Sequence, residues 1–522
     1  MIREISRRKC LRLWLCKPEY MGRTKWENRF VLLRFRKKNY MMFLKDLKRF
    51  KMERLYDKLK AYSESDFYAF HMPGHKRNKA LLGIELPYDL DITEIDGFDD
   101  LHHADGILKE EQERAARVFG AEESHFLVNG STAGILSAVM GCTHRGDKIL
   151  VARHCHKSIY HAIYMNGLVP RYVYPEFDIS MHMNGEISKE DVAKALAAEP
   201  DIKAVVIVSP NYDGVVSDVK GIAEVAHSYR IPLIVDEAHG PHFGFHPAFP
   251  GRANDLGADV VINSLHKTLP SLTQTAILHI NGKIVNRRRI KKYLDMLQSS
   301  SPSYIFMASL DACVDFVDGK CENAFELYVE RLQKFREELK PLQHLQILRT
   351  EHYDISKVVI STANANITSP ELADRLRKEY HLEMEMTGGT YVLAMTTVAD
   401  TQEGLNRLKA ALLEIDDQLE AKTAVSGSIE ISGELPRLEQ YFTPQEAADR
   451  EEDGEAEEIP WKESEGHISL EYAYLYPPGS PVIVPGERIS REAVELLCYY
   501  ETQNLQIEGI QTEGKIKVWK HE

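Results

Sequence analysis

Long apolar runs are missing from this sequence. Stretches such as Ala204–Val208 and Val260–Ile262 are far shorter than the roughly 20 residues that a membrane-spanning helix needs. Cysteine is also scarce, because the 522 residues include seven cysteines and no CxxC pair. This pattern argues against a disulfide framework and predicts a reducing, cytoplasmic location. We therefore expect no membrane partner.

The composition is typical of a globular protein. Hydrophobic residues make up 43% of the chain and charged residues 28%, which excludes global disorder. At about 150 residues per domain, the length predicts two to four domains. The formal net charge of −14 is unevenly spread, because residues 1–51 carry 17 Lys and Arg against 4 Asp and Glu. A net charge of −27 is left for the remaining residues.

Two interpretations of the basic segment 1–51 compete. It could be a tail that binds nucleic acid or an anionic membrane. Alternatively, it is an extension outside the folded enzyme, with translation starting near Met52, where a helical pattern (Met52, Leu55, Leu59) begins. We favour the extension and expect no nucleic-acid partner. A secretory signal is excluded because Arg and Lys interrupt every apolar run of the segment.

Short apolar strands alternate with helices after residue 120. The expected strands are rich in β-branched residues, as strands buried on both faces are: His125–Val128, Lys148–Ala152, Ala204–Val208, Pro232–Val235 and Asp259–Ile262. Helical patterns such as Ser188–Ala198 and Ile222–Tyr229 separate them. This alternation predicts an α/β domain with a mostly parallel sheet, which we assign to residues 52–300 together with an N-terminal arm.

Three further regions follow. Residues 301–413 mix helices (Ala324–Leu339, Pro370–Tyr380) with strands (Lys357–Ser361, Thr390–Ala394) and predict a small α/β domain. Residues 414–467 are expected to be an acidic linker, because QEAADREEDGEAEE (445–458) has eight acidic residues and one Arg, a pattern typical of a solvated, flexible segment. Residues 468–522 form the predicted C-terminal domain.

Candidate functional residues follow the expected strands, since ligands of open α/β sheets bind beyond the strands' carboxyl ends. The first strand leads into Asn129–Gly134, NGSTAG, whose small residues, hydroxyls and helix N–H groups could hold a phosphate. Ser and Thr are equally common as helix caps, so this motif alone leaves both interpretations open. The second strand leads into His154 and His156, which lack the further ligands of a metal site. We expect no metal, and a histidine that either caps a helix or stacks on a planar cofactor.

An aspartate and a lysine complete the pattern. Asp236 ends the fourth strand, where a buried carboxylate needs a cation or a hydrogen-bond donor. Lys267 follows the fifth strand, where it could be a surface residue or a nucleophile with a shifted pKa. A phosphate site, a stacking His, an Asp and a Lys together predict pyridoxal phosphate (PLP), whose aldehyde bonds to the Lys amine and whose pyridine nitrogen pairs with the Asp.

The motifs then resemble those of a known family, the bacterial Orn/Lys/Arg decarboxylases in their shorter form. The matching stretches, in the family's order, are FHMPGHK (Phe70–Lys76), DDLHH (Asp99–His103), NGSTAG, HCHKS (His154–Ser158), VDEAHG (Val235–Gly240), SLHKTLPSLTQTA (Ser264–Ala276), SPSY (301–304) and YPPGSPVIVPGERI (Tyr476–Ile489). The resemblance implies the aspartate-aminotransferase fold, that is, a PLP-dependent transferase (fold type I) large domain, a small α/β domain and a C-terminal α+β decarboxylase domain. It spans nearly all of the chain after Met52.

The resemblance also implies roles for single residues. Lys267 would form the Schiff base, Asp236 would pair with the pyridine nitrogen, and His156 would stack on the ring. His239 would lie close to the cofactor, and Glu487 near the distal cation of the substrate. The phosphate would be held by Ser131, Thr132, Ser264 and His266, and by Ser303 of a neighbouring subunit. The active site would then be shared within a homodimer or a higher homo-oligomer.

The implied reaction is decarboxylation of arginine, lysine or ornithine, with Lys267 or His266 as candidate proton donors to Cα. We favour arginine, giving agmatine, and then lysine, giving cadaverine. Another PLP reaction, such as transamination or aldol cleavage, is not excluded by the cofactor residues alone. A binding protein that uses the basic tail is a third hypothesis, against which the intact pair of Lys267 and Asp236 argues.

Overall fold

The computed structural model describes residues 54–178, 183–348, 352–421, 435–475, 479–502 and 505–520. The basic segment 1–51 and its predicted roles lie outside the described residues. From Leu55 onward the chain forms one compact unit. Within the described ranges, no helix combines the length and the apolar character that crossing a bilayer requires.

A seven-stranded sheet organises the large lobe. Its strands, in spatial order, are β1 (Glu123–Leu127), β9 (Ala276–Ile280), β8 (Val260–Asn263), β7 (Leu233–Asp236), β6 (Val205–Val208), β2 (Lys148–Ala152) and β3 (Val169–Val173). From β8 to β3 all neighbours are parallel, whereas β9 is antiparallel to both β8 and β1. The prediction of a mostly parallel sheet is therefore confirmed.

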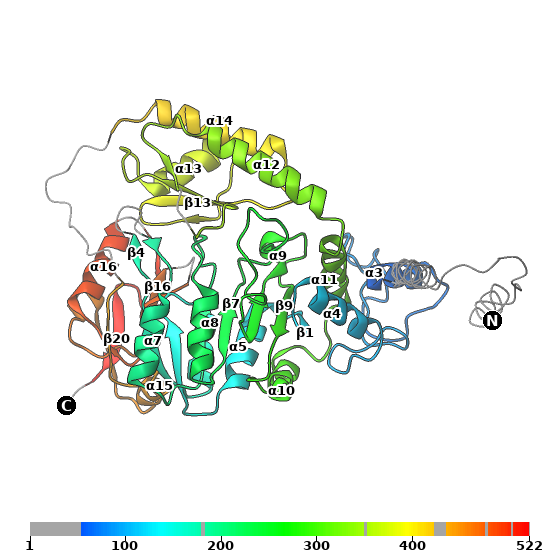
Figure 1. Cartoon of the computed structure of the whole chain (residues 1–522), viewed down its shortest axis with the longest axis horizontal. Helices are drawn as coiled ribbons and strands as arrows, with labels where there is room; N and C mark the ends of the chain where they lie inside the picture. The colour runs from blue at the N-terminus through cyan, green and yellow to red at the C-terminus, as the bar shows by residue number, and fades with distance from the viewer. Residues whose placement is uncertain are drawn as a thin grey trace, which may run out of the picture. The chain divides into compact units, whose positions relative to one another are not determined.

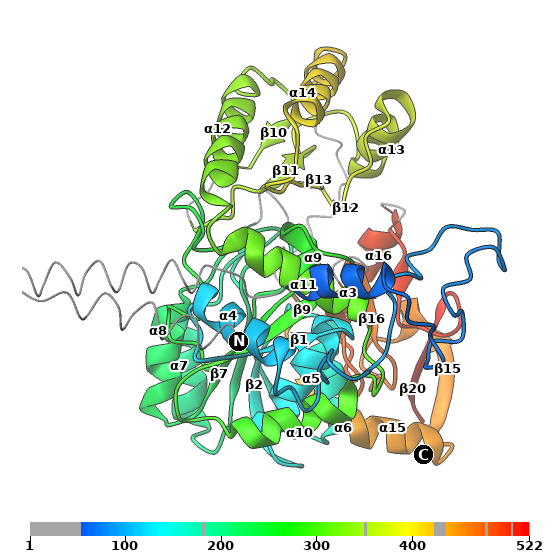
Figure 2. The same cartoon turned by 90° about the vertical axis from the view of Figure 1, so that its right-hand side faces the viewer.

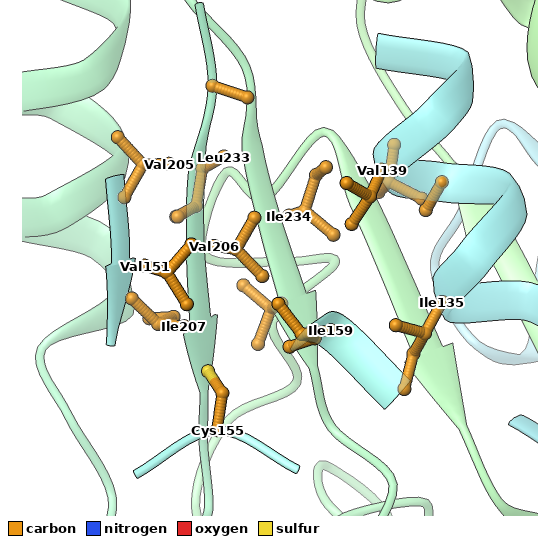
Figure 3. Close-up of a cluster of buried hydrophobic side chains, with 14 of the residues drawn as sticks. Ile135, Val139, Val151, Cys155, Ile159, Val205, Val206, Ile207, Leu233 and Ile234 are labelled. Atoms are coloured by element: carbon orange, nitrogen blue, oxygen red, sulfur yellow. The ribbon is translucent and has the colours of Figure 1, made fainter. Parts of the chain in front are cut away.

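Helices cover both faces of this sheet (Figures 1 and 2). On one face lie α5 (Gly130–Cys142), α6 (Lys157–Met165) and α10 (Arg287–Leu297), and on the other lie α7 (Lys189–Ala198) and α8 (Val219–Ser228). Burial on both sides explains why β6, β7 and β8 have no exposed residue and consist mainly of Val, Ile and Leu. Figure 3 shows Ile135, Val139 and Ile159 from the helices packed over Val206 and Ile234 of the sheet.

The strand register brings the carboxyl ends of three strands together. Val208 of β6 lies opposite Asp236 of β7, which in turn lies opposite Ile262 of β8. The loops after β6 and β7 and the short helix α9 (Leu265–Thr268) after β8 therefore begin side by side. Polar residues that are far apart in the sequence meet at this edge.

The small lobe contains a four-stranded antiparallel sheet. Its order is β10 (Gln346–Ile347), β11 (Lys357–Ser361), β13 (Tyr391–Met395) and β12 (Met386–Thr387). The helices α12 (Glu322–Glu338), α13 (Ser369–Tyr380) and α14 (Gln402–Asp417) lie along one side of it (Figure 2). A capping box of Thr368 and Glu371 starts α13, next to a proline in its first turn.

The helix α11 (Tyr304–Val317) contacts the N-terminal helices of the large lobe, α3 (Leu55–Ser63) and α4 (Ile107–Val118). Leu55 N donates to Asp311 Oδ2 at 3.1 Å, and Arg114 pairs with Asp315 at 3.3 Å. The domain boundary expected near residue 301 remains a prediction.

The C-terminal part combines short strands with two helices. Its elements are β14 (Glu439–Gln440), α15 (Pro444–Glu452), β15 (Ala456–Pro460), a 3-10 turn (Trp461–Glu463), β16 (Ala473–Leu475), β17 (Pro481–Ile483), β18 (Glu487–Arg488), α16 (Arg491–Thr502), β19 (Ile507–Glu508) and β20 (Lys515–Trp519). Strand β15 pairs with β20, β14 with β18, and β16 with both β17 and β19. A two-stranded hairpin of β4 (Phe177–Asp178) and β5 (Met183–Asn184) belongs to the large lobe.

The prediction that residues 445–458 are a flexible segment is wrong, because they form most of α15 and the first part of β15. A capping box of Thr443 and Glu446 starts the helix. Basic residues neutralise part of the acidic run, since Arg450 pairs with Glu455 at 2.9 Å and Lys517 with Glu451 at 2.5 Å. The acidic sequence alone does not predict these ion pairs, because a basic partner such as Lys517 is distant in the sequence.

Candidate active site

A cavity of about 670 Å³ opens at the carboxyl ends of β6 and β7. The N-terminal ends of α5, α6 and α9 line it, and the small lobe contributes Glu385 and Met395. It contains seven of the ten predicted site residues: Ser131, Thr132, His156, Asp236, His239, His266 and Lys267. Residues separated by up to 136 positions in the chain thus meet in one cavity.

One end of the cavity has the features of an anion site. Gly130 has φ of 73°, and the space in which a Cβ would lie is open. Asn129 directs its amide oxygen to Ser299 N at 3.1 Å and does not cap α5, so the first turn keeps N–H groups available for a ligand. Ser131 Oγ lies 2.9 Å from Ser264 Oγ. Hydroxyls and an uncapped helix N-terminus fit a phosphate.

Asp236 is the last residue of β7 and is only 3% exposed. Its carboxylate accepts a hydrogen bond from Ala238 N at 3.1 Å. Burial raises the pKa of Asp236, while the charge of Lys267 and the Ala238 N–H oppose the rise. A carboxylate in such a position fits a protonated ring nitrogen, which would compensate its buried charge.

Lys267 lies in α9, and its amine reaches into the same cavity. Its Nζ is 2.8 Å from His239 Nε2. Burial lowers the pKa of Lys267, and the carboxylates of Asp236 and Glu385 oppose this effect. A buried lysine with a lowered pKa is a good amine nucleophile, because more of it is neutral at ordinary pH.

Two further predicted histidines, His156 and His266, line the cavity. His156 caps α6, and its Nδ1 lies 2.8 Å from Ser158 Oγ. Burial, with smaller contributions from neighbouring cations, lowers the pKa of His156 to about 4, so its ring is neutral and can stack on a planar group. His266 Nδ1 lies 2.9 Å from Thr275 O, which orients its other ring nitrogen.

Three predicted site residues do not line the cavity. Ser264 is fully buried, and its hydroxyl donates to Ser131 Oγ, which lines the cavity. Ser303 caps α11 by accepting a hydrogen bond from Phe306 N, and its predicted contact with a neighbouring subunit remains a prediction.

Glu487 needs a correction, because the structure leaves it no means of binding a substrate cation. It is fully buried, and both of its carboxylate oxygens accept hydrogen bonds from Arg153, each at 2.8 Å. Val484 N donates to the same carboxylate at 2.8 Å. Glu487 therefore joins the C-terminal part to the end of β2.

Four functional candidates were missed in the sequence. Glu385, Tyr212 and Asp213 line the cavity, and Lys357 of β11 contacts His239 behind it. Lys357 opens a strand that was expected from its apolar residues, and a charged residue at such a position usually faces solvent. Only its full burial marks it as unusual.

Comparison with known proteins now identifies the family. Residues 53–365 match the model of the Orn/Lys/Arg decarboxylase major domain, and residues 433–514 match the model of the C-terminal domain of the same family. The chain belongs to the Orn/Lys/Arg decarboxylase family. It is an amino-acid decarboxylase, as the motifs around Lys267 and Asp236 predict.

The decarboxylase is similar to proteins of several bacteria. It is 33% identical to the arginine decarboxylase of Bacillus subtilis over 87% of this chain and 95% of that protein. It is 25% identical to the lysine decarboxylase LdcA of Pseudomonas aeruginosa, over 83% of this chain and 73% of that protein. The Francisella novicida lysine decarboxylase LdcF has the same fold, with a TM-score of 0.76 at 20% identity, over 89% of this chain and 81% of that one.

Membership of this family implies PLP as the cofactor. The residues present fit such a group in three respects. The open N-terminus of α5 suits its phosphate, buried Asp236 suits its ring nitrogen, and the Lys267 amine suits its aldehyde. The decarboxylase therefore has the side chains that this cofactor requires.

Proposed function

We propose that this decarboxylase acts on basic amino acids with arginine as the preferred substrate, and that it uses PLP held at Lys267. The observation that carries the proposal is the convergence of Lys267, Asp236 and the open end of α5 on one cavity. The preference for arginine is supported by relatives named arginine decarboxylase at 32–33% identity, against 23–25% for those named lysine decarboxylase.

Each cavity residue has a distinct task in the proposed reaction. The cofactor supplies an electron sink for the electron pair that is left when CO2 departs. Asp236 holds a proton on the ring nitrogen, which its buried charge favours. Ser131, Thr132 and the first turn of α5 bind the phosphate, and His156 packs on the ring. Lys267 would hold the cofactor through its aldehyde, and Lys267 or His266 would deliver a proton to Cα.

The substrate's distal cation needs a carboxylate, and the cavity contains three. Asp236 is assigned to the cofactor. Asp213 accepts a hydrogen bond from Tyr391 at 2.6 Å, and burial raises its pKa to about 6, which weakens it as a fixed anion. Glu385 is exposed and accepts a hydrogen bond from Tyr212. We therefore assign the distal cation to Glu385.

Glu385→Gln should weaken the binding of basic substrates. Loss of one charged hydrogen bond predicts a KM for arginine that is about tenfold higher or more, with a smaller change in kcat. Steady-state kinetics measure both parameters. Glu383→Gln is the matched control, because Glu383 is an exposed neighbour that does not line the cavity. Equal KM values for the two variants would exclude Glu385 as the partner of the cation.

Amine production tests the proposed function. The purified protein with PLP is incubated separately with arginine, lysine and ornithine, and agmatine, cadaverine and putrescine are quantified. We expect agmatine as the dominant product. Cadaverine or putrescine as the dominant product would change the assigned substrate to lysine or ornithine. No amine from any of the three amino acids would overturn the proposal.

The proposed active site is completed in a homodimer or a higher homo-oligomer. The segment 67–86, which contains the FHMPGHK motif, supports this proposal because it exposes many large apolar side chains. Phe70 is 89% exposed, Leu81 74% and Phe67 68%. A monomer rarely leaves such a surface uncovered. The cytoplasmic location expected from the cysteine pattern also remains a prediction.

A further inference from the structure

His239 links two lysine amines. Its Nε2 lies 2.8 Å from Lys267 Nζ, and its Nδ1 lies 2.9 Å from Lys357 Nζ. Lys267 comes from the large lobe and Lys357 from β11 of the small lobe. His239 is 5% exposed and Lys357 is fully buried, so bulk water does not supply alternative partners to these two groups.

The chemistry of the imidazole restricts the charges of the two lysines. A neutral imidazole has one N–H donor and one acceptor nitrogen, whereas an ammonium group can only donate. If both contacts are hydrogen bonds, the ring N–H donates to one amine, which must then be neutral, and the other ring nitrogen accepts from the second amine, which can be charged. Burial and the adjacent lysines hold the pKa of His239 well below its usual value, so the ring is neutral. The pair of lysines therefore carries at most one charge.

The surrounding charges allow the proton to reside on either lysine. Asp236 faces Lys267, Asp354 and Asp213 face Lys357, and Glu385 acts on both. His156 and His266 also face His239. Burial lowers the pKa of Lys357 to about 8, with Asp354 opposing the shift, so this lysine can exist in both charge states near neutral pH.

The stem of Lys357 is held tightly in place. A Cβ at Gly214 would lie 2.7 Å from Lys357 Cγ, and Gly214 has φ of 106°, which a larger residue rarely adopts. The ring of Tyr212 lies 5.7 Å from Lys357 Nζ and 4.6 Å, between centroids, from the ring of His239. These contacts fix the Nζ of Lys357 beside the imidazole.

We propose that Lys357 is a positioning residue that receives the proton of Lys267 through His239 and so converts Lys267 into a neutral nucleophile. Lys267 gives a proton to His239 Nε2, and His239 Nδ1 gives its proton to the neutral amine of Lys357. The imidazole is neutral before and after the transfer, and its tautomer is reversed. When Lys267 is released again, the proton returns by the same route. The inference rests on the proposed role of Lys267 in capturing PLP.

The test is the pH dependence of cofactor capture, which does not require turnover. Cofactor-free enzyme is mixed with PLP, samples are reduced with borohydride at set times, and the modified Lys267 peptide is quantified by mass spectrometry. In Lys357→Met the proton has no acceptor, so Lys267 stays charged to higher pH. We expect the half-maximal rate to move up by about one to two pH units. The capture rate at pH 7 should fall about tenfold or more, with the maximal rate at high pH retained.

A second variant tests the direction of the effect. Lys357→Arg keeps a permanent cation at Nδ1, which favours the Nε2–H tautomer and a neutral Lys267. Its half-maximal pH should therefore lie at or below that of the wild type. The side chain of Asn cannot exchange its donor and acceptor groups. The half-maximal pH of His239→Asn should therefore rise, as it does in Lys357→Met. The exposed Lys283→Met controls for the loss of one positive charge.

The outcomes separate two kinds of failure. A wild type that is not modified at Lys267 would contradict the proposed function itself. Normal modification, together with unshifted pH profiles in Lys357→Met and His239→Asn, would overturn only the proton transfer. A uniform loss of rate at every pH in Lys357→Met would also overturn it, since that pattern indicates a structural role.

Discussion

Lys267→Ala will lose amine production, with kcat reduced by about 10³-fold or more. Removal of an enzyme's nucleophile lowers kcat by up to about 10⁶-fold in the strongest cases. The expected loss is large because no other residue places a primary amine at the position of the Lys267 Nζ in the described structure. This Nζ lies 2.8 Å from His239 Nε2. Product assays with arginine and mass spectrometry after borohydride reduction measure the rate and the covalent adduct together.

The matched control for this prediction is Lys283→Ala, which removes an exposed lysine. It should retain normal turnover and the borohydride-stable adduct on Lys267. Added methylamine should restore part of the activity of Lys267→Ala, since it supplies an amine in the space that the substitution vacates. Near-normal turnover of Lys267→Ala without added amine would refute the assignment.

Glu487→Ala will destabilise the C-terminal part by about 3–5 kcal/mol, the usual cost of removing one partner of a buried ion pair. Arg153 is 1% exposed and donates to Glu487 at 2.8 Å and to Val482 O at 2.9 Å. Without Glu487 its charge would stay buried with a single carbonyl as its strong acceptor. The free energy of unfolding in urea, followed by tryptophan fluorescence, measures the loss.

Tryptophan fluorescence reports on this part because Trp461 and Trp519 lie in it, while the other two tryptophans of the sequence, Trp14 and Trp26, belong to the basic segment 1–51. Glu495→Ala is the matched control, since it breaks an exposed pair with Arg491 and should cost less than about 1 kcal/mol. Replacing Arg153 and Glu487 together by Met and Leu should recover part of the stability. An unchanged unfolding midpoint with a raised KM for arginine would instead support the earlier assignment of Glu487 to the substrate.

Much of the large lobe could be predicted from short strands with buried β-branched residues. The predicted Lys148–Ala152 and Lys357–Ser361 coincide with β2 and β11. The expected strands Pro232–Val235 and Asp259–Ile262 overlap β7 and β8 but are shifted by one residue toward the N-terminus. These errors are small, because burial on both faces imposes an apolar pattern, whereas hydrogen bonds to neighbouring strands set the ends.

Much of the cavity was predictable where its residues follow parallel strands, although Tyr212 and Asp213 after β6 were missed because their segment is rich in turn residues. Strand order brings the residues after β6, β7 and β8 together whatever their distance in the sequence, which explains why Asp236, His239 and Lys267 were found. Lys357 and Glu385 were missed because they come from the small lobe, whose packing against the large lobe leaves no periodic signal. Glu487 was misassigned because its partner, Arg153, precedes it by 334 residues.

The most direct test of the central claim is the isotopic composition of the product formed from arginine in D2O. Decarboxylation at the cavity of Lys267 and Asp236 replaces the carboxylate with one proton from solvent. The account therefore predicts agmatine with a single deuterium at Cα and an equal amount of CO2. Formation of a keto acid, of a product of side-chain cleavage, or of amine without CO2 would contradict it.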